Sequence, residues 1–563
     1  MVVGMEGRVL AAVLITATIY RTFWALTVST SFVPDEYYQT IEPAYNLIYG
    51  NATSQFHNTW EWRENYRIRS YVPLFPYLLL FKFKYSLQHH WSIFSSEHFV
   101  VKAPRFITGL LISFSDVLLF SILRRISNSN RIAAVIFFVH LFSWSASYCL
   151  SRTLINSTET ALLIIGIYFW SHDNDSGFKA LLGHSKVISA SASHENYIME
   201  ATRRNTSINK CWVITNTDMI WSNIKWYSDF LFRTSITKKQ GQPQITGQTW
   251  NHYIAISIIA ATVHSRPTAI LFWAPLLLFG VWNHRTPLKH ILSCTATGLI
   301  VLTCCIIFDS ICYGHFTVTP LNFFRTNVTN NYAALFYGAK PWHWNFSHNL
   351  PVMLGLYSPF LIFGLLFTPQ PRCAVILELL SILYIILMRC ITAHQEYRFI
   401  LPCLPFLHIA VGYNIWRIIV WCIPSVEESE EHSSCTAISF CCSAFLLSKV
   451  KDESFVDASV NNIALPSIDT KVKMVTDISD PATTIFDVNV TKKKIIEKSL
   501  MRPTEMLPNN QCKTVEKKKM TFIAAFMKFF LLLLLAGVFL IHFSVALYLS
   551  TRHQVIKYIE KNI

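Results

Sequence analysis

The chain contains 563 residues, of which 52% are hydrophobic and only 14% are charged, whereas soluble domains carry about 25% charged residues. Together with a mean hydropathy of +0.35, this composition excludes a soluble globular protein. The net charge of +15 comes from Lys and Arg scattered between apolar runs, which favours the positive-inside bias of membrane loops over a nucleic-acid-binding surface.

Apolar runs of roughly the 20 residues that a helix needs to cross a bilayer recur along the whole chain. We expect the first run to be retained as a span, because no small-residue cleavage site follows it. The predicted spans are approximately 9–30, 105–122, 132–150, 157–171, 251–265, 268–283, 290–311, 351–368, 373–392, 398–422 and 521–549. The predicted fold class is an all-α polytopic membrane protein with about eleven transmembrane helices.

Basic residues in short loops set the expected orientation and organisation. Arg124 and Arg125, Arg285, and Lys517 to Lys519 lie beside spans, and the positive-inside rule places them in the cytosol. The amino terminus is then cytosolic and the carboxyl terminus is not. The first expected part is a membrane half at 1–171 with a non-cytosolic loop at 31–104, followed by a cytosolic polar insert at 172–250. A second membrane half at 251–425 has non-cytosolic loops at 311–350 and 393–398. A disordered cytosolic loop at 426–520 then leads to a last helix with a short tail at 521–563.

One further segment has two possible interpretations, and the cysteines predict no particular site. The apolar stretch 434–447 is either a surface-lying helix or a twelfth span, which would invert the carboxyl terminus. The 14 Cys predict neither disulfides nor a metal site, because many of them, such as Cys294 and Cys305, lie in apolar runs without the paired spacing of metal ligands. They are expected to be small buried hydrophobic residues.

The adjacent carboxylates of Asp35 and Glu36 directly follow the first span. Charge beside hydrocarbon is costly without a compensating role, so a functional role is favoured for this pair, and for Asp35 above all. The predicted topology gathers further polar clusters on the same side: Thr59 to Trp62, Arg69 to Tyr71, Ser151 to Ser157, Arg266 to Thr268, Asp309 to Gly314, Tyr337 to Trp344 and His394 to Phe399.

This combination of side chains suits a phosphorylated, sugar-bearing lipid. Arg and His bind phosphate, Trp faces stack on sugar rings, and Asp or Glu accept hydrogen bonds from hydroxyls. Each cluster also has an interfacial alternative, since Trp forms membrane aromatic belts, Arg reaches from span ends to the headgroups, and His makes hydrogen bonds there.

The motifs themselves resemble a known family. They are Val33-Pro34-Asp35-Glu36-Tyr37-Tyr38-Gln39, Thr59-Trp60-Glu61-Trp62, Arg69-Ser70-Tyr71, Arg152-Thr153-Leu154 with Asn156-Ser157 and Glu159, Tyr337-Gly338 with Pro341-Trp342-His343-Trp344, and His394-Gln395-Glu396-Tyr397-Arg398-Phe399. In this order they resemble the endoplasmic-reticulum mannosyltransferases that use dolichyl-phosphate-mannose, glycosyltransferase family 22, whose architecture is the membrane-embedded GT-C fold. Tyr38 stands where that family usually has Trp, and Gln395 where it often has Lys.

The resemblance implies the substrates and partners: a dolichyl-phosphate-mannose donor, a glycolipid acceptor and the endoplasmic-reticulum membrane, with a luminal site and no cofactor. The Pro-Asp-Glu-Tyr and Pro-Trp-His-Trp forms are most similar to the branch that adds the third mannose, in α-1,2 linkage, to the glycosylphosphatidylinositol (GPI) anchor precursor. Family members continue past their last span into a longer luminal region, and no acceptor contacts from such a region are carried over to a chain that ends at Ile563.

A β-linked donor and an α-linked product imply inversion at the anomeric carbon, which needs one base. Asp35 is the expected base, with Glu36 orienting the acceptor. The expected substrate-binding residues are Arg152, Arg266, Trp342, His343, Trp344, His394, Glu396 and Arg398. No metal is expected, because no DxD-like pair or histidine cluster in the sequence requires one.

Other functions stay open at this stage. Related α-mannosyltransferases add the fourth mannose of the GPI anchor or act on the lipid-linked N-glycan precursor. A membrane transporter would need polar residues and broken helices at mid-membrane, whereas the charges here lie at span ends. An inactive subunit of a lipid-glycosylation complex would retain the motifs' positions without catalysis.

Overall fold

The computed structural model describes residues 2–50, 58–87, 97–172, 250–283, 287–368, 370–423 and 510–551. These residues form helices and irregular segments, with no strand among them. The chain divides into two compact units, Met1–Ser434 with Phe530–Ile563 and Cys435–Phe529. Within the second unit, only the beginning of helix α22 (Asn510–Thr551) is described.

Seven of the described helices are long and apolar enough to cross a membrane. They are Gly7–Thr27, Phe99–Ser127, Leu288–Tyr313, Asn345–Phe367, Cys373–Ile391, Tyr397–Cys422 and Lys528–Thr551. Two shorter apolar helices cover Asn130–Phe142 and Pro267–Val281. The protein is therefore an all-α polytopic membrane protein, as the composition predicts, although the described helices do not establish the predicted count of eleven spans.

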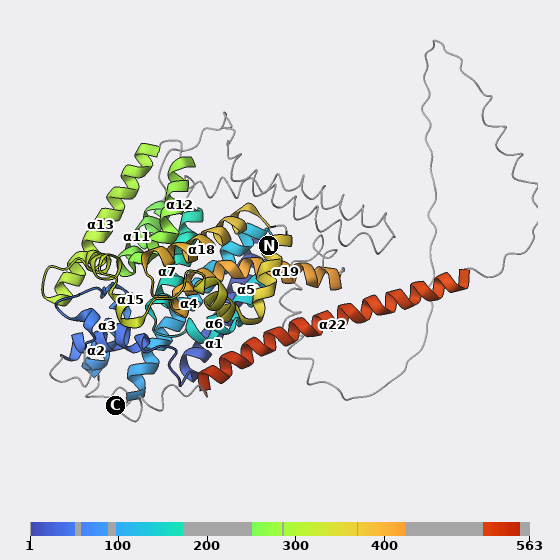
Figure 1. Ribbon diagram of the computed structural model, residues 1–563, viewed down its shortest axis with the longest axis horizontal. Coiled ribbons are helices and arrows are strands. Elements are labelled where there is room, and N and C mark those ends of the chain that lie inside the picture. Colours follow the sequence, from blue (N-terminus) through green and yellow to red (C-terminus); the bar gives the residue numbers. More distant parts are fainter. Residues whose placement is uncertain are drawn as a thin grey trace, which may run out of the picture. The chain divides into compact units, whose positions relative to one another are not determined.

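Helices α1 (Val2–Thr27), α4 (Glu97–Ser127), α5 (Asn130–Phe142) and α7 (Ile155–His172) form the centre of the first unit, with α4 in contact with the other three (Figure 1). Helix α11 (Trp250–Ser265) packs against α7 and α13 (Pro287–Tyr313), and α12 (Ile270–Asn283) packs against α18 (Arg372–Ile391). Helix α19 (Leu404–Cys422) packs against α5, α17 (Ser358–Phe367) and α18.

A buried ion pair joins α1 to α4. The Arg21 Nε lies 2.8 Å from the Asp116 Oδ2, and both side chains are fully buried. Arg21 also donates to the carbonyl of Ala146 at 2.6 Å, and His140 Nε2 lies 3.3 Å from Asp116. Because a buried charge is tolerated only when it is paired and hydrogen-bonded, these contacts allow an arginine within a membrane helix.

The segment after α1 is folded rather than an open loop. It contains the π-helix η1 (Tyr37–Ile41), α2 (Glu42–Tyr49), the short helices η2 (Trp60–Trp62) and η3 (Val72–Leu74), and α3 (Phe75–Leu87). Asp309 of α13 attaches this segment to the membrane helices by accepting from the Tyr71 N–H at 2.8 Å and the Ser70 hydroxyl at 3.1 Å. His264 of α11 lies 2.8 Å from the other Asp309 oxygen.

Three predicted segments differ from the structure or lie outside it. The predicted span 132–150 is broken at Ser143, whose extended backbone (φ −57°, ψ 131°) ends α5 before the short helix α6 (Trp144–Cys149). The predicted loop 426–520 is helical from Asn510, and the part of it from 510 to 520 contains neither Gly nor Pro. The insert 172–250 and the rest of 426–520, including 434–447, lie almost wholly outside the described residues.

Candidate active site

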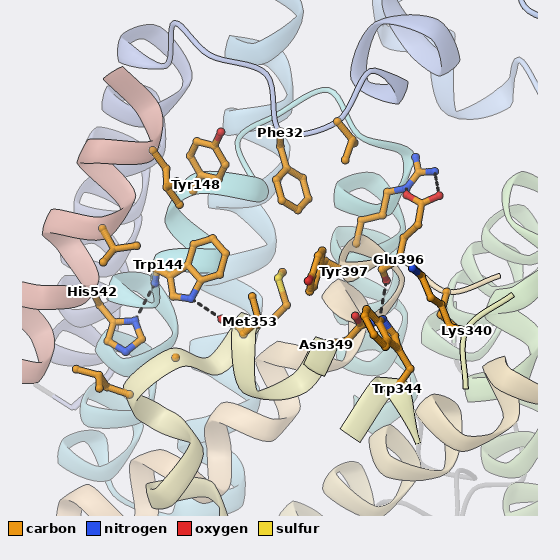
Figure 2. A pocket seen from close by; sticks show the side chains of 18 of the residues that line it. Phe32, Trp144, Tyr148, Lys340, Trp344, Asn349, Met353, Glu396, Tyr397 and His542 are labelled. Atoms are coloured by element: carbon orange, nitrogen blue, oxygen red, sulfur yellow. Dashed lines mark hydrogen bonds and ion pairs between the residues drawn. The ribbon is translucent and has the colours of Figure 1, made fainter. Parts of the chain in front are cut away.

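A pocket of about 1000 Å³ opens between the segment after α1, α6, the helices from residue 344 to 356, the segment 394–398 and α22. One end, which is mostly apolar, is formed by Trp144 and by α22, where His542 lies beside Trp144 (Figure 2) and Val545 follows one turn further along the helix. The other end carries Lys340, Trp344 and a group of charged residues that includes Glu396 (Figure 2). Phe32 and Tyr397 lie between these two ends (Figure 2). A long apolar groove that ends in cations and a Trp matches a lipid with a charged, sugar-bearing head.

Asp35 lies beside the charged end of this pocket. The backbone turns sharply at Pro34, whose carbonyl accepts from the Tyr37 N–H at 3.0 Å, and η1 begins directly afterwards. The Asp35 carboxylate forms an ion pair with Arg398 and accepts from the Gln39 amide at 2.6 Å. Its side chain keeps 26% of its surface exposed, so one part of the carboxylate stays accessible.

Arg398 joins the two halves of the chain at this point. Its Nε and Nη2 lie 2.7 and 3.0 Å from the two Glu396 oxygens, a bidentate pair, while its Nη1 faces Asp35. Although burial opposes ionisation, Arg398 and His394 lower the pKa of Glu396 to about 2. Burial raises the pKa of Asp35 above its ordinary 3.8, the Arg398 guanidinium acts in the opposite direction, and Glu61 and Glu396 add to the rise.

His394 is held as an imidazolium by its two partners. Its Nδ1 lies 3.0 Å from the Gly338 carbonyl and its Nε2 lies 2.9 Å from Glu396 Oε1. A carbonyl only accepts, and an ionised carboxylate only accepts, so both ring nitrogens donate. In agreement, the hydrogen bond to Glu396 raises the pKa of His394 above 6.5, although partial burial opposes this. The charged end of the pocket therefore carries His394 as a cation in addition to Lys340 and Arg398.

The Gln39 side chain connects Asp35 to a second carboxylate, that of Glu61. The Gln39 amide donates to Asp35 Oδ2 and to Glu61 Oε2, the latter at 3.1 Å. Arg69 pairs with Glu61 at 2.6 Å. The motifs around Gln39, Glu61 and Arg69 thus converge on the Asp35 carboxylate and fix its direction.

Glu36 points away from the pocket, and its side chain is fully buried. Arg152 donates to both Glu36 oxygens at 3.0 and 3.1 Å, and Arg105 pairs with the Oε1 at 3.1 Å. Arg152 also donates to the carbonyl of Thr30. The buried ion pair of Glu36 and Arg152 holds the segment that carries Asp35, which favours a positioning role for both residues. The direct contacts with substrate expected for Glu36 and Arg152 stay predictions.

Arg266 is also engaged away from the pocket. It is 7% exposed and its Nε lies 2.7 Å from Glu159 Oε2. Its guanidinium lies 5.4 Å from the centre of the Phe399 ring, and the Arg398 guanidinium lies 5.5 Å from the same ring centre. Arg266 therefore supports the segment 394–399 within the described structure, and its binding of phosphate stays a prediction.

The structure separates the three residues of the Trp-His-Trp segment. Trp344 lines the pocket, stacks on His348 at 4.1 Å and lies under the Lys340 ammonium at 4.7 Å. Trp342 is 78% exposed, and neither Trp342 nor His343 lines the pocket. His343 instead bonds Ser347 at 2.9 Å. Of the three residues, only Trp344 lines the pocket, and the sugar contacts expected for all three stay predictions.

Sequence reasoning did not single out four residues of this site. Gln39, Glu61 and Arg69 belong to the motifs already quoted, and their spacing from Asp35 gave no sign that their side chains meet. Lys340 lies in the same loop as the Trp-His-Trp segment and lines the pocket. Its position beside an interfacial aromatic cluster is the signal that would have identified it.

Residues 12–493 match the profile of the Alg9-like mannosyltransferase family. The chain belongs to this family, whose architecture is the GT-C fold. It is 29% identical over 401 residues to GPI alpha-1,2-mannosyltransferase 3 of Bos taurus, covering 71% of this chain and 58% of that protein. The match to GPI alpha-1,2-mannosyltransferase 3 of Homo sapiens is also 29% identical and covers 71% and 56%.

A third relative, GPI mannosyltransferase 3 of Drosophila melanogaster, is 28% identical over 385 residues, with 67% of this chain and 51% of that protein covered. The chain thus spans between one half and two thirds of the length of these curated relatives.

Proposed function

We propose that this chain is an inverting α-1,2-mannosyltransferase of the endoplasmic-reticulum membrane. It transfers mannose from dolichyl-phosphate-mannose to the GPI anchor precursor, adding the third mannose on the luminal side. The observation that carries this proposal is the pocket that runs from a mostly apolar end beside Trp144 and Val545 to the charged group around Arg398. The names and family of the relatives support the choice of sugar and acceptor.

The apolar end accommodates the first part of the lipid chain, and the charged end accommodates its phosphate. Lys340, His394 and Arg398 are the cations that line this end, with Trp344 beside them for the mannose ring. Cations held in a partly buried site favour the leaving phosphate, which gains one negative charge in the reaction. This stabilisation counts most as the bond to the anomeric carbon lengthens.

In the proposed reaction the acceptor oxygen forms a bond to the anomeric carbon while the bond from that carbon to the phosphate oxygen breaks. The electron pair of the broken bond leaves with dolichyl phosphate, and the acceptor proton moves to the Asp35 carboxylate. A base works best with a pKa near the working pH, which the raised pKa of Asp35 favours. No general acid is required, because the phosphate is a competent leaving group.

Arg398 connects donor binding to this base. Its guanidinium pairs with both Asp35 and Glu396. A donor phosphate that takes up one guanidinium N–H competes with Asp35 for it, and a carboxylate that loses part of a cation becomes more basic. The base therefore becomes stronger when the donor is in place, so that acceptor activation follows donor binding.

Complementation of cells blocked at individual mannosylation steps tests this proposal. Cells lacking the third GPI mannosyltransferase accumulate the precursor with two mannoses, and expression of the chain is expected to clear that lipid and restore surface anchored proteins. Rescue of only the fourth GPI step, or of an N-glycan step, would replace the proposed acceptor. A chain that inserts into the membrane but rescues no step would contradict catalysis. Rescue that is unchanged by Asp35→Asn would contradict the role of Asp35 as the base.

A further inference from the structure

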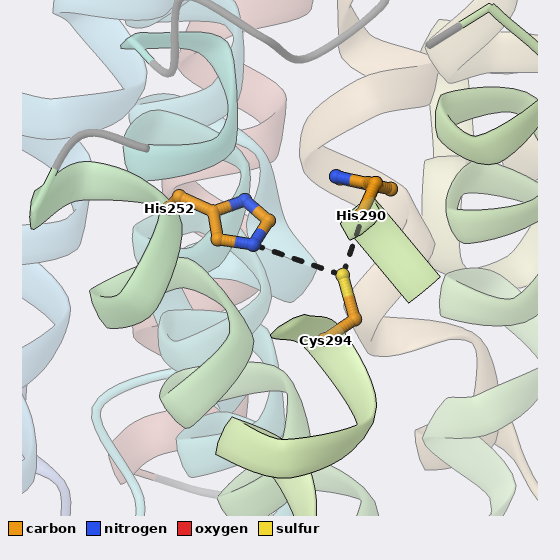
Figure 3. Close-up of side chains that lie close together, drawn as sticks. All are labelled: His252, His290 and Cys294. Carbon is orange, nitrogen blue, oxygen red and sulfur yellow. Dashed lines mark hydrogen bonds between the residues drawn. The ribbon is translucent and has the colours of Figure 1, made fainter. Parts of the chain in front are cut away.

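Three potential metal ligands converge at one end of helices α11 and α13, away from the pocket. They are His252 of α11, and His290 and Cys294 of α13 (Figure 3). Their ligand atoms all lie within 4.8 Å of one another, and both imidazoles are fully buried. The His252 ring comes from the facing helix α11 and the His290 ring from the preceding turn of α13, and the dashed lines in Figure 3 join both rings to the Cys294 sulfur.

The distances fit a tetrahedral metal ion. The Cys294 Sγ lies 3.7 Å from His290 Nε2 and 3.8 Å from His252 Nε2. With Zn–S near 2.3 Å and Zn–N near 2.0–2.1 Å, tetrahedral angles place S and N about 3.5–3.6 Å apart. Zinc binding also requires the two imidazole nitrogens, which lie within 4.8 Å of each other, to approach to about 3.3 Å.

The type of ligand selects the metal. Thiolate and imidazole are the ligands that zinc prefers, whereas Mg²⁺ and Ca²⁺ take oxygen ligands. We propose that His252, His290 and Cys294 bind one Zn²⁺ ion, with a fourth position for water. Binding converts the Cys294 thiol to a thiolate and releases its proton.

The surroundings suit a rigid site. Trp170 of α7 has its ring centre 6.4 Å from that of His252 and 6.1 Å from that of His290. Gly280 of α12 leaves the room for this indole, since a Cβ there would lie 2.8 Å from the Trp170 ring and 3.7 Å from His290 Nε2. Four helices therefore meet around the cluster and hold the ligands in place.

A zinc ion here has a structural use. Only 6% of the most apolar stretch of α13 is buried, so side-chain packing holds this helix weakly. A metal bound by residues of both helices attaches α13 to α11. The same α13 carries Asp309, which holds the segment after α1, so the ion stabilises the scaffold of the site without contacting substrate.

The test is the zinc content of the full chain, purified in detergent without chelators and measured by inductively coupled plasma mass spectrometry. About one Zn²⁺ per chain is expected. Cys294→Ser and the double variant His252→Asn/His290→Asn should each lower it roughly tenfold or more. Cys304→Ser, an exposed cysteine of the same helix, is the matched control and should keep the metal.

A second measurement needs no variant that might fail to fold. Chelator-treated wild-type chain titrated with Co²⁺ should develop a near-ultraviolet thiolate-to-cobalt absorption that saturates at one equivalent and that added Zn²⁺ removes. Wild-type chain with neither zinc nor this absorption would overturn the proposal, as would full metal content in Cys294→Ser. Asp35→Asn should retain the zinc, so this outcome is independent of mannosyl transfer.

Discussion

Asp35 and Arg398 form an ion pair within one compact unit, although they lie far apart in the sequence. Asp35 follows the first helix, and Arg398 begins the segment that leads into α19. The contact places a carboxylate with a raised pKa directly beside a cation that also lines the pocket. In the proposed mechanism, this ion pair joins the base directly to a group that binds the donor phosphate.

The substitution Asp35→Asn should abolish transfer while the chain stays folded in the membrane. The Asn amide keeps the shape of the Asp side chain and part of its contact with Arg398, but it has no basic oxygen. Loss of a general base costs roughly 10²- to 10⁴-fold in rate. Initial rates in microsomes with saturating donor measure this. Glu64→Gln, an exposed carboxylate in the same segment, is the control. Activity within about threefold of wild type would remove Asp35 as the base.

The substitution Arg398→Lys should raise the donor Michaelis constant and lower turnover. Lysine keeps the charge but loses the bidentate contact with Glu396 and the simultaneous contact with Asp35. Hydrogen bonds to charged groups contribute about 1.5–3 kcal/mol, so kcat/KM should fall roughly 10- to 100-fold. The exposed Arg63→Lys serves as control. Unchanged donor kinetics in Arg398→Lys would exclude it from the phosphate site.

The dependence of kcat/KM on pH should be bell-shaped. The base must be deprotonated, so activity falls as pH falls through the pKa of Asp35, which lies above 3.8. His394 must be protonated to attract phosphate, so activity falls as pH rises through its pKa, which lies above 6.5. His394→Asn should remove the alkaline limb and leave the acid limb in place. An alkaline limb that persists in this variant would assign it to another group.

The substitution Glu36→Gln should destabilise the protein rather than alter the chemistry. It leaves the buried guanidiniums of Arg152 and Arg105 without their counter-charge, and breaking a buried pair costs about 3–5 kcal/mol. We expect a lower thermal unfolding midpoint and less protein in the membrane, with residual activity per folded molecule. A normally stable Glu36→Gln that binds acceptor poorly would instead confirm a direct contact with the acceptor.

The substitution Val545→Trp tests the apolar end of the pocket. Val545 of α22 lines this end and is 39% exposed, so a larger side chain fits there and fills part of the groove. Overpacking typically costs about 1–3 kcal/mol. The Michaelis constant for a long-chain donor should rise about tenfold, whereas a short-chain analogue should be affected less. Val545→Ile is the conservative control, and equal effects on both donors would place the lipid elsewhere.

Much of this protein could be predicted from its sequence because membranes impose simple rules. Low charge and repeated apolar runs are enough to identify a polytopic helical protein, since the bilayer leaves few ways to satisfy a backbone. The Asp35 motif and the motif from His394 to Phe399 identified the family, and the cost of charge beside hydrocarbon favoured a functional role for Asp35, which stays a prediction.

Only the tertiary structure decided how the side chains of these motifs divide their roles. Glu36 is adjacent to Asp35 in sequence, yet successive residues near a helix start point in different directions. Glu36 is fully buried against Arg152, whereas Asp35 is partly exposed and pairs with Arg398, which lines the pocket. Cys294 was expected to be an ordinary buried residue, and its approach to His252 depends on the packing of two helices whose contact no local spacing encodes. Periodicity determines which residues form a helix, whereas the partners of a polar side chain depend on contacts between distant segments.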